Sequence, residues 1–275
     1  MKSTEEVSSE RPSDAFFEAT GAQKAAGVGA IVAAIIATGM VIAWADKHDT
    51  DKNYLGGLNW NKRVFNWHPV LMISGMILCL ICSLLSYRII QLPKASQKIV
   101  HFLLHSGAVV CVITGLAAVV TSHNYTDHNK NGAYTANLYS MHSLIGVTAL
   151  VLYFSNYIMG FMSFLMRCTG ADMRKSFMPN HVFLGICTLI VGFCAVESGI
   201  TELTTKLGCI YTVSSADWNP AENYHELSDG CKLANGLGIV VLLAVLLCAY
   251  ALLGPGKSAF KNDGQEDSIQ SRLHP

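Results

Sequence analysis

Four histidines are placed where they could act together on a metal. His68, His101, His142 and His181 each open one of four consecutive apolar runs, at or just before its first residue. Two imidazoles that reach in from different helices suit the two axial positions of a haem iron, and filling both leaves no position for O₂ or a substrate. The pattern therefore predicts electron transfer rather than oxygen chemistry.

The direction of the helices sorts these histidines into two pairs. If consecutive helices run antiparallel, His68 and His142 begin helices at one face, the outer face, and His101 and His181 begin helices at the opposite, inner face. From His101 to His123 is 22 residues, or about 33 Å of helix, so the two levels lie a membrane apart. Two haems held in this way would relay electrons across a bilayer.

Other interpretations of the histidines stay open at this point. A single histidine of this kind is more often an interfacial or packing residue, and the matching places on four consecutive helices are what favour the pairs. Zinc fits less well, because neither face has the cysteine or acid cluster that completes a tetrahedral site. His105 lies one turn beyond His101 on the same helix face and complicates the inner assignment.

The composition indicates what must position these side chains. Of the 275 residues, 51% are hydrophobic and 14% are charged, with a mean hydropathy of +0.37. A soluble globular protein carries about 25% charged residues. The 19 basic and 19 acidic residues cancel, so no basic surplus exists for binding nucleic acid. The chain is therefore expected to lie in a lipid bilayer, and disorder is excluded.

Six apolar runs are each close to the ~20 residues that cross a bilayer as a helix. They contain one formally charged residue, Glu197, and they cover 25–45, 69–87, 102–122, 143–166, 182–201 and 233–254. Because they do not alternate polar with apolar residues, the predicted fold is an all-α bundle of six transmembrane helices rather than a barrel. We expect polar tails over 1–24 and 255–275, a transmembrane domain over 25–254, and a four-helix haem core at about 60–205.

The distribution of basic residues predicts the orientation. The tails and the connectors 88–100 and 167–181 together hold 12 Lys and Arg, against 7 in the loops on the other side. The positive-inside rule then places both termini in the cytosol. Cys209 and Cys231 fall in a loop on the non-cytosolic side, where oxidising conditions allow a disulfide, with two free thiols as the alternative.

Four motifs in this order resemble those of the cytochrome b561 family, the six-helix, two-haem reductases that use ascorbate. The likeness runs from about residue 60 to 205, and its motifs are Phe65-Asn66-Trp67-His68-Pro69, Lys94-x-x-x-Lys98-x-x-His101, Tyr139-Ser140-Met141-His142-Ser143 and Arg174-x-x-x-Met178-Pro179-x-His181. The resemblance implies two haems b, an outer one held by His68 and His142 and an inner one held by His101 and His181. It favours His101 over His105 as the inner ligand.

The resemblance also implies residues around the haems. Those that match the haem pockets of the family are Arg88, Asn137, Leu138, Tyr139, Ser140 and Glu202. Glu197 has no counterpart by resemblance. It either hydrogen-bonds a polar group near the outer haem or extends toward the membrane interface, and the second alternative is favoured.

The two faces are expected to bind different substrates. Lys94, Lys98 and Arg174 precede the inner histidines by one or two helical turns and suit an anionic donor, although such cations also anchor helices at a membrane. The resemblance implies that ascorbate binds there and gives one electron. His123 resembles the acceptor-side histidine of the family and could bind ferric iron or pass a proton. Asp127 and His128 follow in a loop with no expected ligand role.

The leading hypothesis is thus a transmembrane reductase that passes electrons from cytosolic ascorbate to a ferric chelate or monodehydroascorbate outside. The alternative is a haem b membrane-anchor subunit of a quinone-linked respiratory complex, which the three cations disfavour because a neutral quinone needs no such cluster. A haem-free transporter is a third class, but the spans offer little for an ion path. A homodimer is implied by resemblance alone, and the plasma, vesicular and lysosomal membranes are not distinguished.

Overall fold

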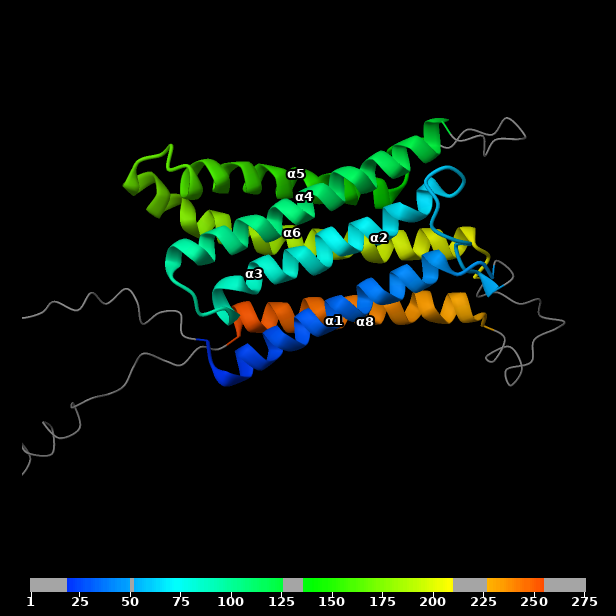
Figure 1. Ribbon diagram of the computed structural model, residues 1–275, viewed down its shortest axis with the longest axis horizontal. Coiled ribbons are helices and arrows are strands. Elements are labelled where there is room, and N and C mark those ends of the chain that lie inside the picture. The colour runs from blue at the N-terminus through cyan, green and yellow to red at the C-terminus, as the bar shows by residue number, and fades with distance from the viewer. Residues whose placement is uncertain (1–18, 50–51, 126–135, 210–226, 255–275) are drawn as a thin grey trace, which may run out of the picture.

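The computed structural model describes residues 19–49, 52–125, 136–209 and 227–254. Within these ranges, every regular element is helical apart from one β-bridge between Asn59 and Arg63. The long helices lie side by side in an elongated bundle (Figure 1). Six of them are long and apolar enough to cross a membrane. The prediction of an all-α six-helix bundle is confirmed.

The spans are continuous except for changes of helix type. In chain order the elements are α1 (Gly21–Asp46), η3 (Val64–Asn66), α2 (Trp67–Ile73), η4 (Ser74–Cys79), α3 (Leu80–Ile89), α4 (Lys94–Tyr125), α5 (Met141–Gly160), η5 (Phe161–Leu165), α6 (Ala171–Lys206) and α8 (Asp229–Leu253). The segments η3 to α3 form the second span, and η5 is the last turn of the fourth. Of the short segments, η3 is a 3₁₀ turn, whereas η4 and η5 are π-helical.

All six helical spans begin earlier than the predicted apolar runs, and four of them also end later. At α1, the Thr20 side chain accepts from the backbone N–H of Gln23, whose side chain accepts in return from Thr20 N–H. This capping box starts the helix at Gly21, so the predicted tail boundary at residue 24 falls inside α1. Hydropathy predicts only the part of a helix in hydrocarbon, because capping decides where it ends. Residues 1–18 and 255–275 lie outside the described ranges.

The helices pack unevenly. α1 lies along α8, α5 lies along α6, and α2 and α3 lie against α4 (Figure 1). The buried Ala30, Ala34 and Ala37 present small side chains on α1, which allow its backbone to come close to α8. Such close approach replaces the hydrophobic driving force that is absent between helices in lipid.

The packing between α4 and α5 is looser than that between the other neighbouring helices. These two helices follow each other in sequence but do not pack closely in the part of the chain that the structure describes. Aromatic side chains connect them instead. The Tyr153 hydroxyl donates to the His105 carbonyl at 2.8 Å, and the Phe102 ring stacks on Phe161 at 5.4 Å between ring centroids.

A disulfide marks one end of the bundle. Cys209, just after α6, is bonded to Cys231 in the first turn of α8, and both residues are buried. We call this end, where α1 finishes and α2 starts, the disulfide end. The other end, where α1 begins and α8 finishes, is the terminal end (Figure 1). The disulfide that the cysteine positions allowed is therefore present.

The disulfide closes a loop of sequence separation 22. By loop-closure entropy, Cys209→Ser is expected to lower the free energy of unfolding by about 3 kcal/mol. The measurement is the thermal midpoint of the helical circular-dichroism signal with and without a reducing agent. Reduction should lower the wild-type midpoint and leave that of Cys209→Ser unchanged. Cys168→Ser, at an exposed free cysteine, is the control. Equal midpoints for wild type and Cys209→Ser would contradict this role.

Candidate functional site

His68 and His142 meet at the disulfide end. His68 stands in the first turn of α2 and His142 in the first turn of α5, and their ring centroids are 6.1 Å apart. Both line a cavity of about 430 Å³ that also contacts α1, α4, α6 and α8. The two histidines that the sequence assigns to one face are thus neighbours across the bundle.

His101 and His181 meet at the terminal end. They lie on α4 and α6, with ring centroids 6.3 Å apart. Aromatic side chains surround them, since Tyr87 lies 5.3 Å from His101 and Phe164 lies 5.2 Å from His181 between ring centroids. His105 packs edge-on against His101 at 4.5 Å, and its buried Nδ1 has no hydrogen-bond partner among the described residues.

Each of the four rings is held through Nδ1. The acceptors are the carbonyl of Gly115 for His68 at 3.1 Å, that of Ser83 for His101 at 2.9 Å, that of Ala195 for His142 at 2.8 Å, and Asn156 Oδ1 for His181 at 2.9 Å. Because these oxygens only accept, Nδ1 must carry the proton, and the lone pair of each ring lies on Nε2. A metal-binding histidine commonly has this arrangement, since the bond fixes the tautomer and orients the ring.

These hydrogen bonds link the helices in two reciprocal sets. His68 of α2 donates to α4, and His101 of α4 donates back to α3 in the same span as α2. His142 of α5 donates to α6, and His181 of α6 donates back to α5. Each histidine pair therefore joins a side chain of the α2–α4 set to one of the α5–α6 set across the bundle.

Glycines make room for two of the rings. A Cβ at Gly199 of α6 would lie 2.8 Å from an atom of the His142 ring, and one at Gly160 of α5 would lie 2.7 Å from the His181 ring. On both helices the histidine and the glycine are 18 residues apart, which is five full turns. They therefore share one face of each helix, so α5 and α6 meet as near-equivalent partners running in opposite directions.

The two pairs fit a bis-imidazole haem. Metal–imidazole bonds of about 2.0 Å place the ring centroids of two opposed ligands about 6 Å apart, close to the 6.1 and 6.3 Å observed. The 4.5 Å between His101 and His105 is too short for such an arrangement. Within the described ranges, no three His, Cys, Asp or Glu side chains gather as a metal site by themselves. Each pair offers two imidazole nitrogens, the donor set that holds a haem with two histidine ligands.

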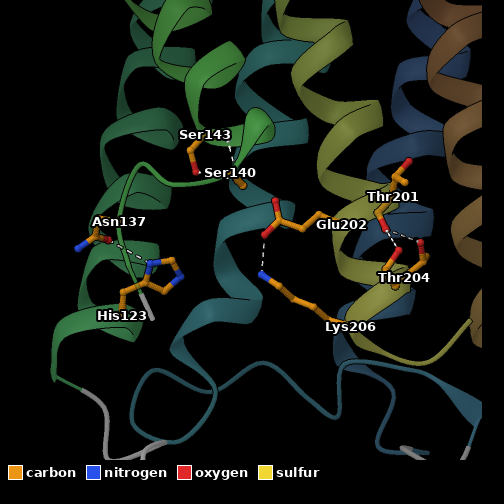
Figure 2. Close-up of polar contacts among 9 residues, drawn as sticks. His123, Asn137, Ser140, Ser143, Thr201, Glu202, Thr204 and Lys206 are labelled. Carbon is orange, nitrogen blue, oxygen red and sulfur yellow. Dashed lines mark hydrogen bonds and ion pairs between the residues drawn. The ribbon is translucent and has the colours of Figure 1, made fainter. Parts of the chain in front are cut away.

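The mouth of the cavity at the disulfide end is polar. His123 Nδ1 lies 3.0 Å from Asn137 Oδ1, and Lys206 Nζ lies 2.5 Å from Glu202 Oε1, as Figure 2 shows. All four residues line the cavity, together with Leu138, whose backbone has a positive φ of 55°. The structure thus brings together four of the predicted residues, His123, Asn137, Leu138 and Glu202.

Two further predicted residues, Tyr139 and Ser140, do not line the cavity itself, although Ser140 hydrogen-bonds Glu202 in its wall. Tyr139 is 86% exposed and is not part of the cavity wall. Ser140 caps α5, where its hydroxyl accepts from Ser143 N–H (Figure 2). Asp127 and His128 lie outside the described residues.

The predicted cations lie at the terminal end. Lys94 and Lys98 occupy the first two turns of α4, and Arg174 lies in the first turn of α6, where it donates to the Thr169 carbonyl. Arg88, at the end of α3, donates to the Leu252 carbonyl at 2.9 Å and so contacts the end of α8. These positions put the cations on the turns before His101 and His181.

Sequence reasoning missed the groups that hold the rings. Asn156 has a detectable signal, because an amide within an apolar span is costly unless it has a partner. It accepts from His181 Nδ1 and donates back to the His181 carbonyl at 3.1 Å. The acceptors of Ser83, Gly115 and Ala195 are backbone carbonyls, which every residue carries, so no side-chain pattern reveals them.

Comparison with known proteins identifies the same family that the sequence motifs resemble. The eukaryotic cytochrome b561 family profile matches residues 67–206. The human protein named lysosomal membrane ascorbate-dependent ferrireductase CYB561A3 is 37% identical over 203 residues, which cover 72% of this chain and 77% of that protein. The zebrafish (Danio rerio) protein of that name is 33% identical over 195 residues, which cover 69% and 73%. The mouse protein named transmembrane ascorbate-dependent reductase CYB561 is 32% identical over 202 residues, which cover 72% and 73%. The chain therefore belongs to the cytochrome b561 family.

Proposed function

We propose that this chain is a transmembrane ascorbate-dependent reductase. Electrons pass from ascorbate at the terminal end, through two haems b, to an acceptor at the disulfide end. The observation that carries the proposal is that two histidine pairs lie at opposite ends of the bundle. In each ring Nδ1 donates a hydrogen bond, which leaves Nε2 free to bind a metal. The names of the relatives, ascorbate-dependent ferrireductase and reductase, support the same reaction.

Four residues hold the proposed cofactors. His68 and His142 bind the haem of the disulfide end, and His101 and His181 bind that of the terminal end. When bound by two imidazoles, a haem would supply one-electron transfer and would not bind O₂. The chain keeps each imidazole neutral at Nε2 and oriented by its Nδ1 hydrogen bond, which also makes the nitrogen a stronger ligand.

Cations at the terminal end attract the donor. Ascorbate is an anion at neutral pH, and Lys94, Lys98 and Arg174 are positive and lie on the turns that lead to the terminal-end histidines. Lysine supplies a mobile point charge, whereas arginine supplies a planar fork that fits adjacent oxygens. The basic connectors at this end favour its placement in the cytosol, with both termini.

His123 is the proposed contact for the acceptor at the disulfide end. Its Nδ1 faces the Asn137 side-chain oxygen, which leaves Nε2 as the atom that can bind ferric iron or hold a proton. A ferric chelate is the favoured acceptor, since the human and zebrafish relatives are named ferrireductases. Monodehydroascorbate is the second acceptor that this site could reduce.

The quinone-linked alternative is not favoured, because the relatives are named for ascorbate and not for quinone. A homodimer remains a prediction from the family resemblance.

A reduced-minus-oxidised absorption spectrum of the purified protein tests the function directly. Ascorbate is expected to raise the band of b-type haem, and ferric citrate is expected to bleach it. A haem band that responds to a quinol but not to ascorbate would favour the respiratory-subunit alternative. A protein purified without b-type haem would contradict both.

The histidine pairs predict which variants act together. His68→Ala and His142→Ala should each remove the disulfide-end haem, while His101→Ala and His181→Ala should remove the other. Haem per protein would fall to about half in each case, since two axial positions serve each iron. The measurement is haem content with a redox titration that separates the two centres. Equal loss of both centres from every variant is the result that contradicts the pairing.

Glycine variants give a milder version of the same test. Gly199→Ala adds a methyl group that should displace only His142, and Gly160→Ala adds one that should displace only His181. The titration should therefore shift one centre in each variant, and a different one. Gly39→Ala is the matched control, because a Cβ at Gly39 meets nothing within 4 Å.

Removing a terminal-end cation should slow reduction by ascorbate. Lys98→Gln or Arg174→Gln removes a charge-assisted contact of about 1.5–3 kcal/mol, so the rate at low ascorbate should fall about tenfold or more. Stopped-flow absorbance measures this rate, and dithionite reduction checks that haem content holds. Lys175→Gln, at an exposed cation beside Arg174, is the control. Unchanged rates in both test variants would refute the donor site.

A further inference from the structure

Glu197 is a carboxyl group that the redox chemistry does not use. It stands within the membrane-spanning part of α6, and its side chain is turned toward α8, where a Cβ at Gly238 would lie 2.8 Å from Glu197 Oε2. Its Oε1 is buried without a hydrogen-bond partner among the described residues. The favoured expectation, that this residue extends to the membrane interface, is therefore wrong.

A second cavity lies beside this carboxyl. It has a volume of about 290 Å³ between α6 and α8, in the half of the bundle near the disulfide end. Thr201 and Thr204 continue the wall from Glu197 at one-turn spacing. Figure 2 shows them on the side of α6 away from Glu202, which lines the cavity of His68 and His142. The two cavities thus flank α6, and Ile200 contributes to both. We call the second one the Glu197 cavity.

The wall of the Glu197 cavity presents acceptors. The Thr201 hydroxyl donates to the Glu197 carbonyl at 2.9 Å, and that of Thr204 donates to the Ile200 carbonyl at 2.8 Å. Because each threonine hydroxyl donates its one proton to a backbone carbonyl, it can only accept a hydrogen bond from a molecule in the cavity. The Asn235 side chain, exposed on α8, adds an amide to the same wall. A hydroxyl group both donates and accepts, so it suits the carboxyl whether ionised or protonated.

Polarity changes along the cavity in the direction of the bundle axis. Thr201, Thr204 and Asn235 lie toward the disulfide end, whereas Phe193 and Leu242 lie deeper in the bundle. Ile239, two-thirds exposed, borders the deep half on α8. A molecule that enters from the lipid with a polar head toward the disulfide end and an apolar body toward the membrane centre would match this gradient.

We propose that the Glu197 cavity is a binding site for a neutral membrane lipid with a free hydroxyl group. The hydroxyl is the hydrogen-bond partner of Glu197 Oε2, since Oε1 is buried out of reach of the cavity. Phe193, Ile239 and Leu242 pack against the apolar body. An unpaired carboxyl in an apolar setting costs several kcal/mol, so the bond stabilises the site and the lipid together. A charged headgroup is excluded by the same depth, because it would have to leave the interface.

Photolabelling in lipid nanodiscs tests the site. The probes are a photoactivatable sterol and a photoactivatable diacylglycerol, both with a free hydroxyl, and the competitors are the unlabelled lipids and their methyl ethers. We expect at least one probe to label peptides of α6 and α8, with competition from the free-hydroxyl lipid and not from its ether. The probe that labels identifies the lipid class. No labelling of these peptides, as for a cavity that holds water only, would overturn the proposal, and so would equal competition by the ether.

Matched variants connect the labelling to the carboxyl. Glu197→Leu should reduce it about tenfold, the size of a lost hydrogen bond, whereas Glu197→Gln, which can still hydrogen-bond a hydroxyl, should keep most of it. Ser198→Ala is the control, because Ser198 is the next residue on α6, lies outside the cavity and bonds only its own helix backbone. Asn235→Leu, at an exposed position, should also weaken labelling if Glu197→Leu fails to fold. Labelling that is the same in wild type and the folded Leu variants would refute the site.

Discussion

The hydrogen bond from imidazole Nδ1 to an oxygen of another helix is the interaction on which this bundle depends. It occurs at all four paired histidines, with separations of 2.8–3.1 Å. In a bilayer, helices gain little from apolar contact with one another, because lipid is equally apolar. Polar contacts and close-packed small residues must therefore set the arrangement. Here the same bonds that position helices also decide which nitrogen is free to bind a metal.

This double role explains the uneven packing. α5 and α6 meet through glycines that admit an imidazole from the opposite helix. α2 is joined to α4 by a histidine that donates to an α4 carbonyl, and α4 is joined to α3 by a histidine that donates to an α3 carbonyl. Between the two sets, α4 and α5 are connected by aromatic rings rather than by close backbone contact. Ring side chains thus lie between the two sets, whereas α1 and α8 pack closely through alanines.

Much of the fold could be predicted from the sequence, because a long apolar run permits only one backbone solution in lipid. The positions of His68, His101, His142 and His181 at the starts of such runs were enough to predict their pairing. The sequence could not reveal the π-helical turns η4 and η5 or the backbone acceptors, since neither depends on side-chain type. The direction of the Glu197 side chain was also missed, because it depends on a glycine 41 residues later, on α8.

The equal spacing on α5 and α6 has a consequence for how this hairpin can vary. His142 and Gly160 on one helix face Gly199 and His181 on the other, so contacts about 27 Å apart share one register. A slip of one residue would break both ends together, whereas the apolar residues between them contribute little to the choice of register. Substitutions in the middle of the hairpin should therefore be tolerated, whereas the histidine and glycine positions at its two ends should not vary. The α5–α6 hairpin thus fixes the distance along the bundle between the two histidine pairs.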